Sequence, residues 1–574
     1  MDEYLKEEIS YGIISYMKKV TLSAIALLLI FNLFLPASPQ DLYDYDSEES
    51  VLTRFLCDAS SVTGPSAVYP LTARELEVAL DRIDRSNLDA DLLNLYDFLY
   101  KEITSDYNGF GVEYAIDISP QVFITDHYYD LASDGGRNSF YIPYNKEIPA
   151  LRGYLGLSYR NNAFIETEMV AKNSPLNDGI LLTSFDWLIN HRNGEWNFMG
   201  ANSTGLVATI PFLARGSVGN DWINLTLGRT PHKIGNGFTG NLVVDDNFDY
   251  QELMKVSFIG DWITYNIMIT QFDTQSGIDY FDTSHFSGMF QSRVVHRLEF
   301  NIWKKLKVSV DMGTLFYTSS SFDFRWLTPF MIIHNYYNYS ESPILYQYDE
   351  ANNINGFSFE WSIGNGWKVG GQFVLDQFQT FFEDQDSLPS AYGLLANVSW
   401  SSNVDSSLIT AWSEFVYTNP YLYLNPKFNQ DADGNLTPNY NYDYILGYHR
   451  RGWQASSIAF SGYPMGPDAI VAAAGVDYRN LDLNLKADFE LRYSVHGVKG
   501  FVDHDFSGDF KDTTPSGLNP EHRFSFIADC SYQIIPGTLD VYGGMGLTGI
   551  WNKAHTTDFS FEPDGYVGLT WHML

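Results

Sequence analysis

The sequence has few cysteines, few basic residues and, beyond its N-terminal region, no long apolar run. A disulfide between Cys57 and Cys530 would need an oxidising compartment, and we expect two unpaired thiols instead. Lysine and arginine number 35 against 70 acidic residues, and the net charge of −35 argues against nucleic acid or anionic phospholipid as a partner. After Leu35 no stretch reaches the ~20 apolar residues of a spanning helix, so membrane insertion would have to use strands.

Aromatic residues, in contrast, are abundant. They make up 16% of the chain and stand singly between polar residues rather than in apolar runs. Mean hydropathy is therefore slightly negative, at −0.18. Strands of this composition have one apolar and one polar side, which is typical of a β-barrel whose outer face contacts lipid and whose lumen contacts water.

The N-terminus predicts an export signal. Met17-Lys18-Lys19 begins a basic segment before the apolar run Val20–Leu35, and "PASPQ" supplies small residues for cleavage near Ala37 to Gln40. An uncleaved anchor is the alternative, but the run is shorter than the ~20 residues that a spanning helix needs. We therefore expect residues 1–40 to be a signal peptide.

Helical signals follow, and we expect residues 41–110 to be a periplasmic helical segment. Thr72 and Glu75 form a capping box straight after Pro70. The stretch "DADLLNLYDFLYKEI" then places its apolar residues on one helical face. The pattern predicts two helices between Thr72 and Ile103 that pack on the domain that follows.

From Val112 the hydrophobic period changes to two, which indicates strands. "LRGYLGLSYR" and "AFIETEMVAK" flank Asn161-Asn162 and predict a hairpin. Tight turns such as "IGNGWK" alternate with long acidic loops, which is the asymmetry of outer-membrane barrels. At ~10 residues a strand plus a turn or loop of roughly 15, residues 111–574 predict an all-β transmembrane barrel of about 18 antiparallel strands.

Several short motifs occur in an order that resembles the Wzi capsule-assembly family of outer-membrane proteins. The matching motifs are a Pro-Leu start to the helical segment, a glycine-rich stretch, a His-Arg strand, a Pro-Phe…His stretch, and a Tyr-x-His-like segment that leads to Gly-Pro-Asp. They lie at Pro70-Leu71; Gly228, Arg229, Gly235, Gly237, Gly240 and Leu242; His296 and Arg297; Pro329, Phe330 and His334; Tyr448, Arg450-Arg451-Gly452 and Gly466-Pro467-Asp468. The resemblance spans most of residues 68–574.

The resemblance implies a monomeric outer-membrane barrel, closed at its periplasmic end by the helices, that binds surface or capsular polysaccharide and helps attach or organise it. Its other partners would be outer-membrane lipid and the barrel-assembly machinery. Sugar rings stack on Trp and Tyr, while uronic acids attract Arg and His. The candidate glycan residues are His449, Arg450, Arg451, Trp453, Tyr463, Arg229, His296, Arg297 and His334.

An alternative role for the cations is charge neutralisation in the lumen. Arginines paired with Asp and Glu would account for Arg229, Arg297, Arg325 and Arg450 without any ligand, and we favour this interpretation. Two other functions stay open: a diffusion porin or solute channel with cation preference, because the chain is acidic, and an outer-membrane hydrolase using Asp186 and Glu195.

Metal and catalytic motifs are weak. Asn429, Asp431 and Asp433 match the start of a Ca²⁺ loop, but Tyr440 stands where the bidentate acid belongs. The sequence "DHD" at residues 503–505 has no second histidine nearby, and no Gly-x-Ser-x-Gly or phosphate-binding loop occurs. We expect a binding protein rather than an enzyme, with no cofactor.

Overall fold

The computed structural model describes most of the chain. The described residues are 40–104, 109–124, 148–173, 181–183, 206–247, 250–272, 290–318, 322–329, 346–377, 390–404, 406–424, 428–430, 436–438, 445–449, 456–500 and 512–573. The predicted signal peptide lies almost wholly outside them and stays a prediction. Within these ranges, no helix is long and apolar enough to span a membrane.

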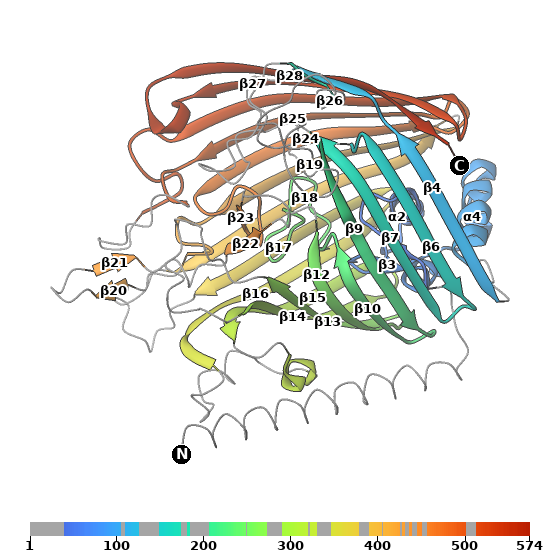
Figure 1. The fold of residues 1–574 in the computed structure, drawn as a ribbon, viewed down its shortest axis with the longest axis horizontal. Helices are drawn as coiled ribbons and strands as arrows, with labels where there is room; N and C mark the ends of the chain where they lie inside the picture. The colour runs from blue at the N-terminus through green and yellow to red at the C-terminus, as the bar shows by residue number, and fades with distance from the viewer. Residues whose placement is uncertain are drawn as a thin grey trace.

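Most of the described residues form a closed barrel of 18 antiparallel strands (Figure 1). Neighbours in sequence pair with each other around the wall, and β28 closes it against β4 and β5. The 18 strands are β4 (Phe110–Ile118), continued after a short break by β5 (Gln121–Ile124), β6 (Leu151–Tyr159), β7 (Ala163–Asn173), β9 (Leu206–Gly219), β10 (Ile223–Thr230), β12 (Gln251–Phe258), β13 (Ile263–Phe272), β14 (Phe290–Ile302), β15 (Leu306–Thr318), β16 (Tyr346–Gly364), β17 (Trp367–Gln377), β18 (Ala391–Val404), β19 (Ser407–Thr418), β24 (Ala469–Asn480), β25 (Leu485–His496), β26 (Glu521–Ile535), β27 (Leu539–Trp551) and β28 (Phe559–His572). The short segment β8 (Leu181–Thr183) pairs with β5 and is not counted among them.

Tight turns gather at one end of the barrel and long connections at the other. The predicted hairpin is present as β6 and β7, although its left-handed residue is Arg160, with φ 46°, rather than the Asn pair after it. Between β16 and β17, Asn365 and Gly366 both have positive φ, and a side chain at Gly366 would meet the carbonyl oxygen of Ser401. We call the end with these turns the short-turn end and the other the long-loop end.

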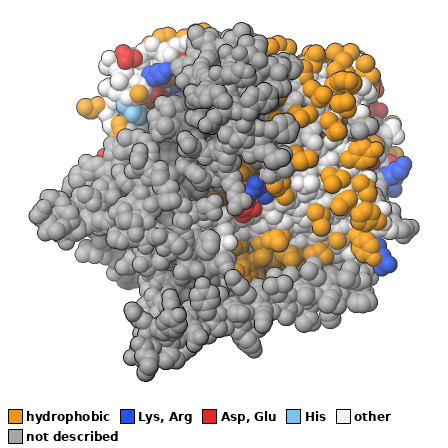
Figure 2. All heavy atoms as spheres, viewed as in Figure 1, with side chains coloured by type: hydrophobic (Ala, Val, Ile, Leu, Met, Phe, Trp, Pro, Cys, Tyr) orange, Lys and Arg blue, Asp and Glu red, His pale blue; other side chains and the backbone are white. Residues whose placement is uncertain are grey.

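The outer wall carries the apolar half of the alternation. Figure 2 shows hydrophobic side chains gathered over the wall where β4 to β9 lie in Figure 1. Val112, Tyr114 and Ile165 are all exposed there. Trp222, Trp262 and Trp303 are exposed beside three successive tight turns. Such an aromatic belt is typical of a membrane interface, and the alternation confirms the predicted transmembrane barrel.

A helical module covers the short-turn end. It consists of α2 (Glu48–Ala59), α3 (Ala73–Leu80) and α4 (Ala90–Ile103) around a shared apolar core, with the short 3-10 helix η1 (Arg85–Asn87) before α4. The Thr72 side chain accepts from the Glu75 backbone N–H, and the Glu75 carboxylate accepts from the Thr72 N–H, so the capping box is confirmed. Helix α2 was not predicted.

Three contacts attach this module to tight turns of the barrel. The Thr63 N–H donates to the Lys304 carbonyl over 2.9 Å, and the Asn403 amide donates to Asp89 over 3.1 Å. The Gly366 N–H donates to the Ser61 hydroxyl over 3.3 Å. Both cysteines are free: Cys57 is buried in α2, and Cys530 is exposed on β26.

Candidate functional site

The lumen beside β12–β19 is filled by the protein's own chain. The filling segments come from the N-terminal module, from the β10–β12 connection, and from the connection between β19 and β24. Together with lumen-facing wall residues they make one apolar cluster, which includes Val68, Ile234, Leu242, Val244, Val295, Leu315, Ile354, Val374, Leu395, Val416, Leu422, Tyr423, Phe460 and Tyr463. We call these filling segments the plug.

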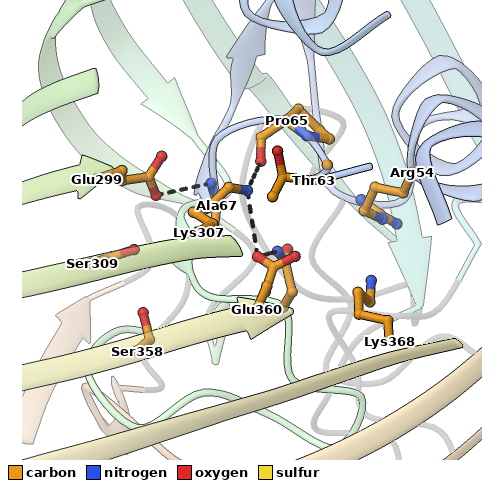
Figure 3. A network of polar contacts seen from close by, with 12 residues as sticks. Arg54, Thr63, Pro65, Ala67, Glu299, Lys307, Ser309, Ser358, Glu360 and Lys368 are labelled. Atoms are coloured by element: carbon orange, nitrogen blue, oxygen red, sulfur yellow. Dashed lines mark hydrogen bonds and ion pairs between the residues drawn. The ribbon is translucent and has the colours of Figure 1, made fainter. Parts of the chain in front are cut away.

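The first plug segment, residues 60–70, enters from the short-turn end and is held by charged wall residues (Figure 3). The Lys307 ammonium donates to the Pro65 carbonyl and lies 3.4 Å from the Glu360 carboxylate. The Ala67 N–H donates to Glu299 over 3.3 Å. Because Lys307 and Glu299 are each 1% exposed, these contacts replace water inside the barrel.

Two further buried ion pairs join the module to the wall. Lys255 on β12 donates to the carbonyls of Val68 and Pro70 and lies 3.1 Å from the capping carboxylate of Glu75. Lys368 on β17 lies 2.8 Å from Asp58 of α2. Lys255 is 0% exposed, so its charge depends entirely on these partners.

The second plug segment, residues 231–247, is pinned by a carboxylate. Glu414 on β19 accepts from the backbone N–H groups of Phe238 and Thr239 over 2.9 and 2.7 Å, and from the Thr239 hydroxyl over 2.6 Å. The Phe238 ring stacks on Trp412 with centroids 4.6 Å apart and parallel planes. Gln372 adds a bond to the Leu242 N–H.

The third plug segment follows β19 and is joined to the others by tyrosines. The Tyr423 N–H donates to Asp376 over 2.8 Å, and its hydroxyl donates to the Leu242 carbonyl over 2.6 Å. Tyr463 in turn donates its N–H to the Tyr423 hydroxyl, and its own hydroxyl lies 2.9 Å from that of Thr239. The first segment joins them through the Ala67 carbonyl, which accepts from the Gly235 N–H over 2.8 Å, so all three segments belong to one hydrogen-bonded unit.

Burial changes the acidity of the helical module. It raises the pKa of Asp44 to about 6, although Arg215 lies 2.5 Å away and opposes the shift. Burial, with help from nearby Glu113, raises the pKa of Asp41 to about 6. It also raises the pKa of the Cys57 thiol to about 12, which makes that thiol unreactive near neutral pH.

Two of the predicted site residues lie inside the barrel and are fully engaged there. Arg297 is 2% exposed and bonds to Glu299 over 2.7 Å and to Asp311 over 2.6 Å. This arrangement agrees with the prediction that Arg297 neutralises acidic side chains in the lumen without any ligand. Tyr463 is 1% exposed within the plug and leaves no ring face on which a sugar could stack in this conformation.

Two others lie on the outer wall. Arg229 shares the outward face of β10 with exposed Leu227 and pairs with Glu252 over 2.7 Å. His296 also points outward, where its Nε2–H donates to the carbonyl of Trp326 and its Nδ1 accepts from the Tyr265 hydroxyl. The prediction that Arg229 neutralises the lumen is therefore wrong.

The wall around His296 is covered by the chain itself. The 3-10 helix η4 (Phe324–Leu327) lies against the outside of β13–β15 (Figure 1) and buries Trp326 on Ile269, Val294 and Phe316. Arg325 in this helix pairs with Asp323 rather than with a lumen acid, so its predicted lumen role is also wrong.

The remaining candidates fall at the edge of the described structure. Arg450, Arg451, Trp453 and His334 lie outside the described residues, and for His449 only its place in β22 (Ile445–His449), paired with β23 (Ser456–Phe460), is described. Asn429 lies in β20 (Phe428–Gln430), paired with β21 (Leu436–Pro438), while Asp431 and Asp433 are outside the described residues, as are Asp186 and Glu195. In the described part of the chain, no group of His, Cys, Asp and Glu could hold a metal ion.

The residues that hold the plug were missed by sequence reasoning. Lys255 in "ELMKVSF" and Glu414 in "AWSEFVY" are lone charges at lumen-facing positions of strands with apolar neighbours. A lone charge in that setting signals a buried partner. The partner itself comes from a distant segment, which no local pattern could have named.

Comparison with solved structures identifies the architecture. The Escherichia coli outer-membrane protein Wzi, described as a carbohydrate-binding β-barrel involved in group 1 capsule assembly, aligns with a TM-score of 0.53 and 12% identity, over 92% of this chain and 98% of its own. This chain has the Wzi barrel fold. Pseudomonas aeruginosa OccK3 and OprD align less well, with TM-scores of 0.37 and 0.39, identities of 10% and 6%, 80% and 81% of this chain covered, and 95% and 97% of their own.

Sequence comparison adds no family. No protein-family model matches the chain, and no curated protein does. The Wzi likeness therefore establishes the fold of an outer-membrane β-barrel, and the function has to be argued from the chain's own residues.

Proposed function

We propose that this protein is an outer-membrane barrel that binds surface polysaccharide through its long-loop end and does not conduct solutes. The observation that carries the proposal is the plug. Three segments of the chain occupy the lumen where a porin would leave water, joined to one another by Tyr423, Tyr463 and the pairing of Val68 with Ile234. The carbohydrate binding described for Wzi, which has the same fold, also supports it.

Glycan contact is proposed for the cationic and aromatic stretch around His449. Arg450 and Arg451 would donate charge-assisted hydrogen bonds to sugar carboxylates, with Trp453 as a stacking surface. His334 would add a further contact from the connection between β15 and β16. We propose that these residues bind an acidic polysaccharide, with the helical module on the periplasmic side.

The test combines retention with salt dependence. Arg450→Ala with Arg451→Ala should lower retention of acidic polysaccharide by cells and flatten its dependence on salt, because fewer ion pairs remain to be screened. Lys304→Ala with Lys305→Ala is the matched control, since both lysines are exposed at the short-turn end and the charge change is the same. Equal losses in the two double variants would contradict glycan binding at the long-loop end.

A cation-preferring channel is the second candidate, because the lumen wall of β24–β28 is partly open to water. Lumen-facing Asp488 is exposed, whereas the wall residues behind the plug are buried. Conductance of the full chain in planar bilayers separates the two candidates. A closed barrel should give no steady single-channel steps, and a stable cation-selective conductance would replace the proposal with the channel.

A further inference from the structure

The first strand of the barrel runs past the last strand at the short-turn end. β28 pairs with β4 at Ile118 and Asp117, and the last bond of this seam runs from the Met573 N–H to the Ile116 carbonyl over 2.9 Å. β4 begins six residues before Ile116 and pairs with β6 along its whole length. Figure 1 shows this part of β4 beyond the C-terminal end of β28. Phe110–Ala115 is therefore an edge with β6 on one side and no strand of the described chain on the other.

The seam above this edge is held by side chains. Ring nitrogens of His572 on β28 lie 2.7 Å from the Asp117 carboxylate on β4 and 3.3 Å from the Asp540 carboxylate on β27. The hydroxyls of Thr570 and Ser119 lie 2.9 Å apart further along the same seam. Because these contacts hold the end of β28 against β4, the edge below them is part of the folded wall and is available for pairing without any opening of the barrel.

The backbone of the edge directs hydrogen-bonding groups away from the barrel. In β4 the carbonyl of odd-numbered Gly109 faces β6, whereas that of even-numbered Ile116 faces β28. Phe110, Val112 and Tyr114 therefore point their N–H and C=O groups to the open side, where no described residue bonds to them. An unpaired row of this kind is a template for another strand.

The outward side chains of the edge are those of a strand-forming segment. Phe110, Val112 and Tyr114 are 66, 53 and 59% exposed, and all three residue types favour strands. The edge contains no proline, lysine or bulge, which are features with which proteins block such a template. A bare edge is not tolerated in hydrocarbon, so this edge requires either water or another strand.

The other face of the edge is acidic. Glu113 is exposed on the lumen side of β4, and Glu102 of α4 is exposed as well. Burial, and then repulsion by Glu113, Glu166 and Glu102, raises the pKa of nearby Asp41 to about 6. Successive side chains of a strand laid along the edge would lie alternately beside the apolar row and beside these acids. Complementary charge therefore requires basic residues at the positions beside Glu113, and an acidic strand would be repelled.

A second copy of this barrel does not fit the edge. The two-fold axis that relates two antiparallel strands is perpendicular to their sheet. Pairing of two β4 edges about such an axis would turn one barrel upside down in the membrane relative to the other. The occupant therefore has to be a separate segment that is free to lie antiparallel to β4.

We propose that Phe110–Ala115 is a docking site for an extended segment of a partner protein in which basic and apolar residues alternate. The segment would lie antiparallel to β4, in line with β28, and would bond to the backbone of Phe110, Val112 and Tyr114. Its apolar side chains would extend the outer apolar row, and its basic side chains would pair with Glu113. The inference concerns the opposite end of the barrel from the proposed glycan contacts and is independent of them.

The test measures fluorescence anisotropy of a labelled heptapeptide, in which lysine alternates with valine and phenylalanine, on the full chain in nanodiscs. The native chain should bind this peptide. Val112→Pro removes an edge-facing N–H and leaves the bonds to β6 intact, so it should weaken binding at least about tenfold. Val112→Thr keeps the N–H and a β-branched side chain, and as the matched control it should bind as the native chain does. Heat modifiability on gels verifies that each variant is folded.

The charge requirement is tested with further variants and a second peptide. Glu113→Gln should weaken binding about twofold to fivefold, as expected for an exposed ion pair. Asp558→Asn, which changes an exposed acid at the long-loop end, should leave binding unchanged. A heptapeptide with glutamate in place of lysine should not bind.

Three outcomes would each overturn the proposal: absence of binding to the native chain, unchanged binding in Val112→Pro, or equal binding of the acidic heptapeptide. A stable dimer of the chain that Val112→Pro dissociates would also overturn it, because the edge would then pair with a second copy. Arg450→Ala with Arg451→Ala should not change peptide binding, so failure of the surface-polysaccharide proposal is recognised separately.

Discussion

Two parts of the barrel wall, β12–β19 and β24–β28, have the same strand alternation, but their lumen-facing side chains differ in how far they are buried. Lumen-facing residues of β12–β19, such as Lys255, Val295 and Ser309, are at most 1% exposed, whereas Asp488 on the β24–β28 wall is exposed. The difference is set by what lies against each wall. The plug packs on β12–β19, whereas the β24–β28 wall is open to water near the short-turn end.

The chemistry of each wall follows from this contact. Behind the plug, every charge described above has a partner at short distance, such as Lys307 with Glu360 or Lys368 with Asp58. On the β24–β28 wall, Asp477 and Asp488 lie directly opposite each other, and the bases Arg479 and Lys486 form the next pair toward the short-turn end. The period-two alternation of each strand thus determines which side chains face the lumen. Contact with the plug then determines which of these lumen-facing side chains are buried.

The largest expected effect comes from removing a charge behind the plug. Lys255→Met leaves Glu75 buried without its counter-charge, which should weaken docking of the helical module by about 3–5 kcal/mol. The measurement is the urea midpoint of the helical circular dichroism. Lys486→Met removes a cation whose pair with Glu48 is 40% and 53% exposed, and it should shift the midpoint little. Equal shifts would contradict the contrast between the walls.

The next effect concerns the pin of the second plug segment. Glu414→Gln keeps the shape but loses charge-assisted bonds to Phe238, Thr239 and the Thr239 hydroxyl, at a cost of about 2–3 kcal/mol. Hydrogen exchange at the Phe238 and Thr239 amides should quicken, while amides of β25–β27 keep their protection. Faster exchange throughout the barrel would mean that Glu414 supports the wall and not the plug.

A pH dependence follows from the Asp44 carboxyl. Its pKa is raised from 3.8 to about 6 by burial, so the docked module binds the proton more tightly than the released one. This contribution is full below about pH 4 and is lost as pH rises through 6, with a size of about 3 kcal/mol. The urea midpoint should therefore fall across that range. Asp44→Asn should reduce the slope without abolishing it, because the pKa of Asp41 is also raised to about 6, and Asp97→Asn, an exposed acid on α4, should leave the slope unchanged.

The smallest expected effect lies at the start of α3. Thr72→Ala removes the side-chain acceptor of the capping box and should cost about 1 kcal/mol of the same helical transition. Thr72→Ser retains the hydroxyl and should behave as the native chain. If Thr72→Ala lowered the stability of the helical transition as much as Lys255→Met, Thr72 would contribute to docking of the module on the barrel as well as to capping of α3.

Sequence reasoning reached the barrel because its signals are local. Alternation around Val112–Ile118, the tight turn at Asn365-Gly366 and the capping box at Thr72 each act within a few residues. The roughly correct strand number followed from spacing alone. Helix α2 was missed because its apolar face is interrupted by charged residues and packs on strands far along the chain.

The site was less predictable because its contacts span long distances in sequence. The prediction that Arg297 pairs with acids in the lumen is correct. The same prediction for Arg229 is wrong, because Arg229 lies on the outward face of its strand. Tyr463 was singled out for its ring and proved to be part of the plug. Glu414 accepts from the Thr239 N–H, which lies 175 positions earlier in the chain, and only the fold reveals such a pair.

The most direct test of the central contrast is thiol accessibility at two matched serines. Ser309→Cys lies behind the plug, where the serine is 1% exposed, and Ser531→Cys lies on the lumen side of β26, where the serine is half-buried, each in a Cys530→Ser background that keeps buried Cys57. A charged maleimide should modify the thiol at position 531 within minutes and leave that at position 309 unmodified until the module is released by urea. Equal labelling of the two positions in the native barrel would contradict the account.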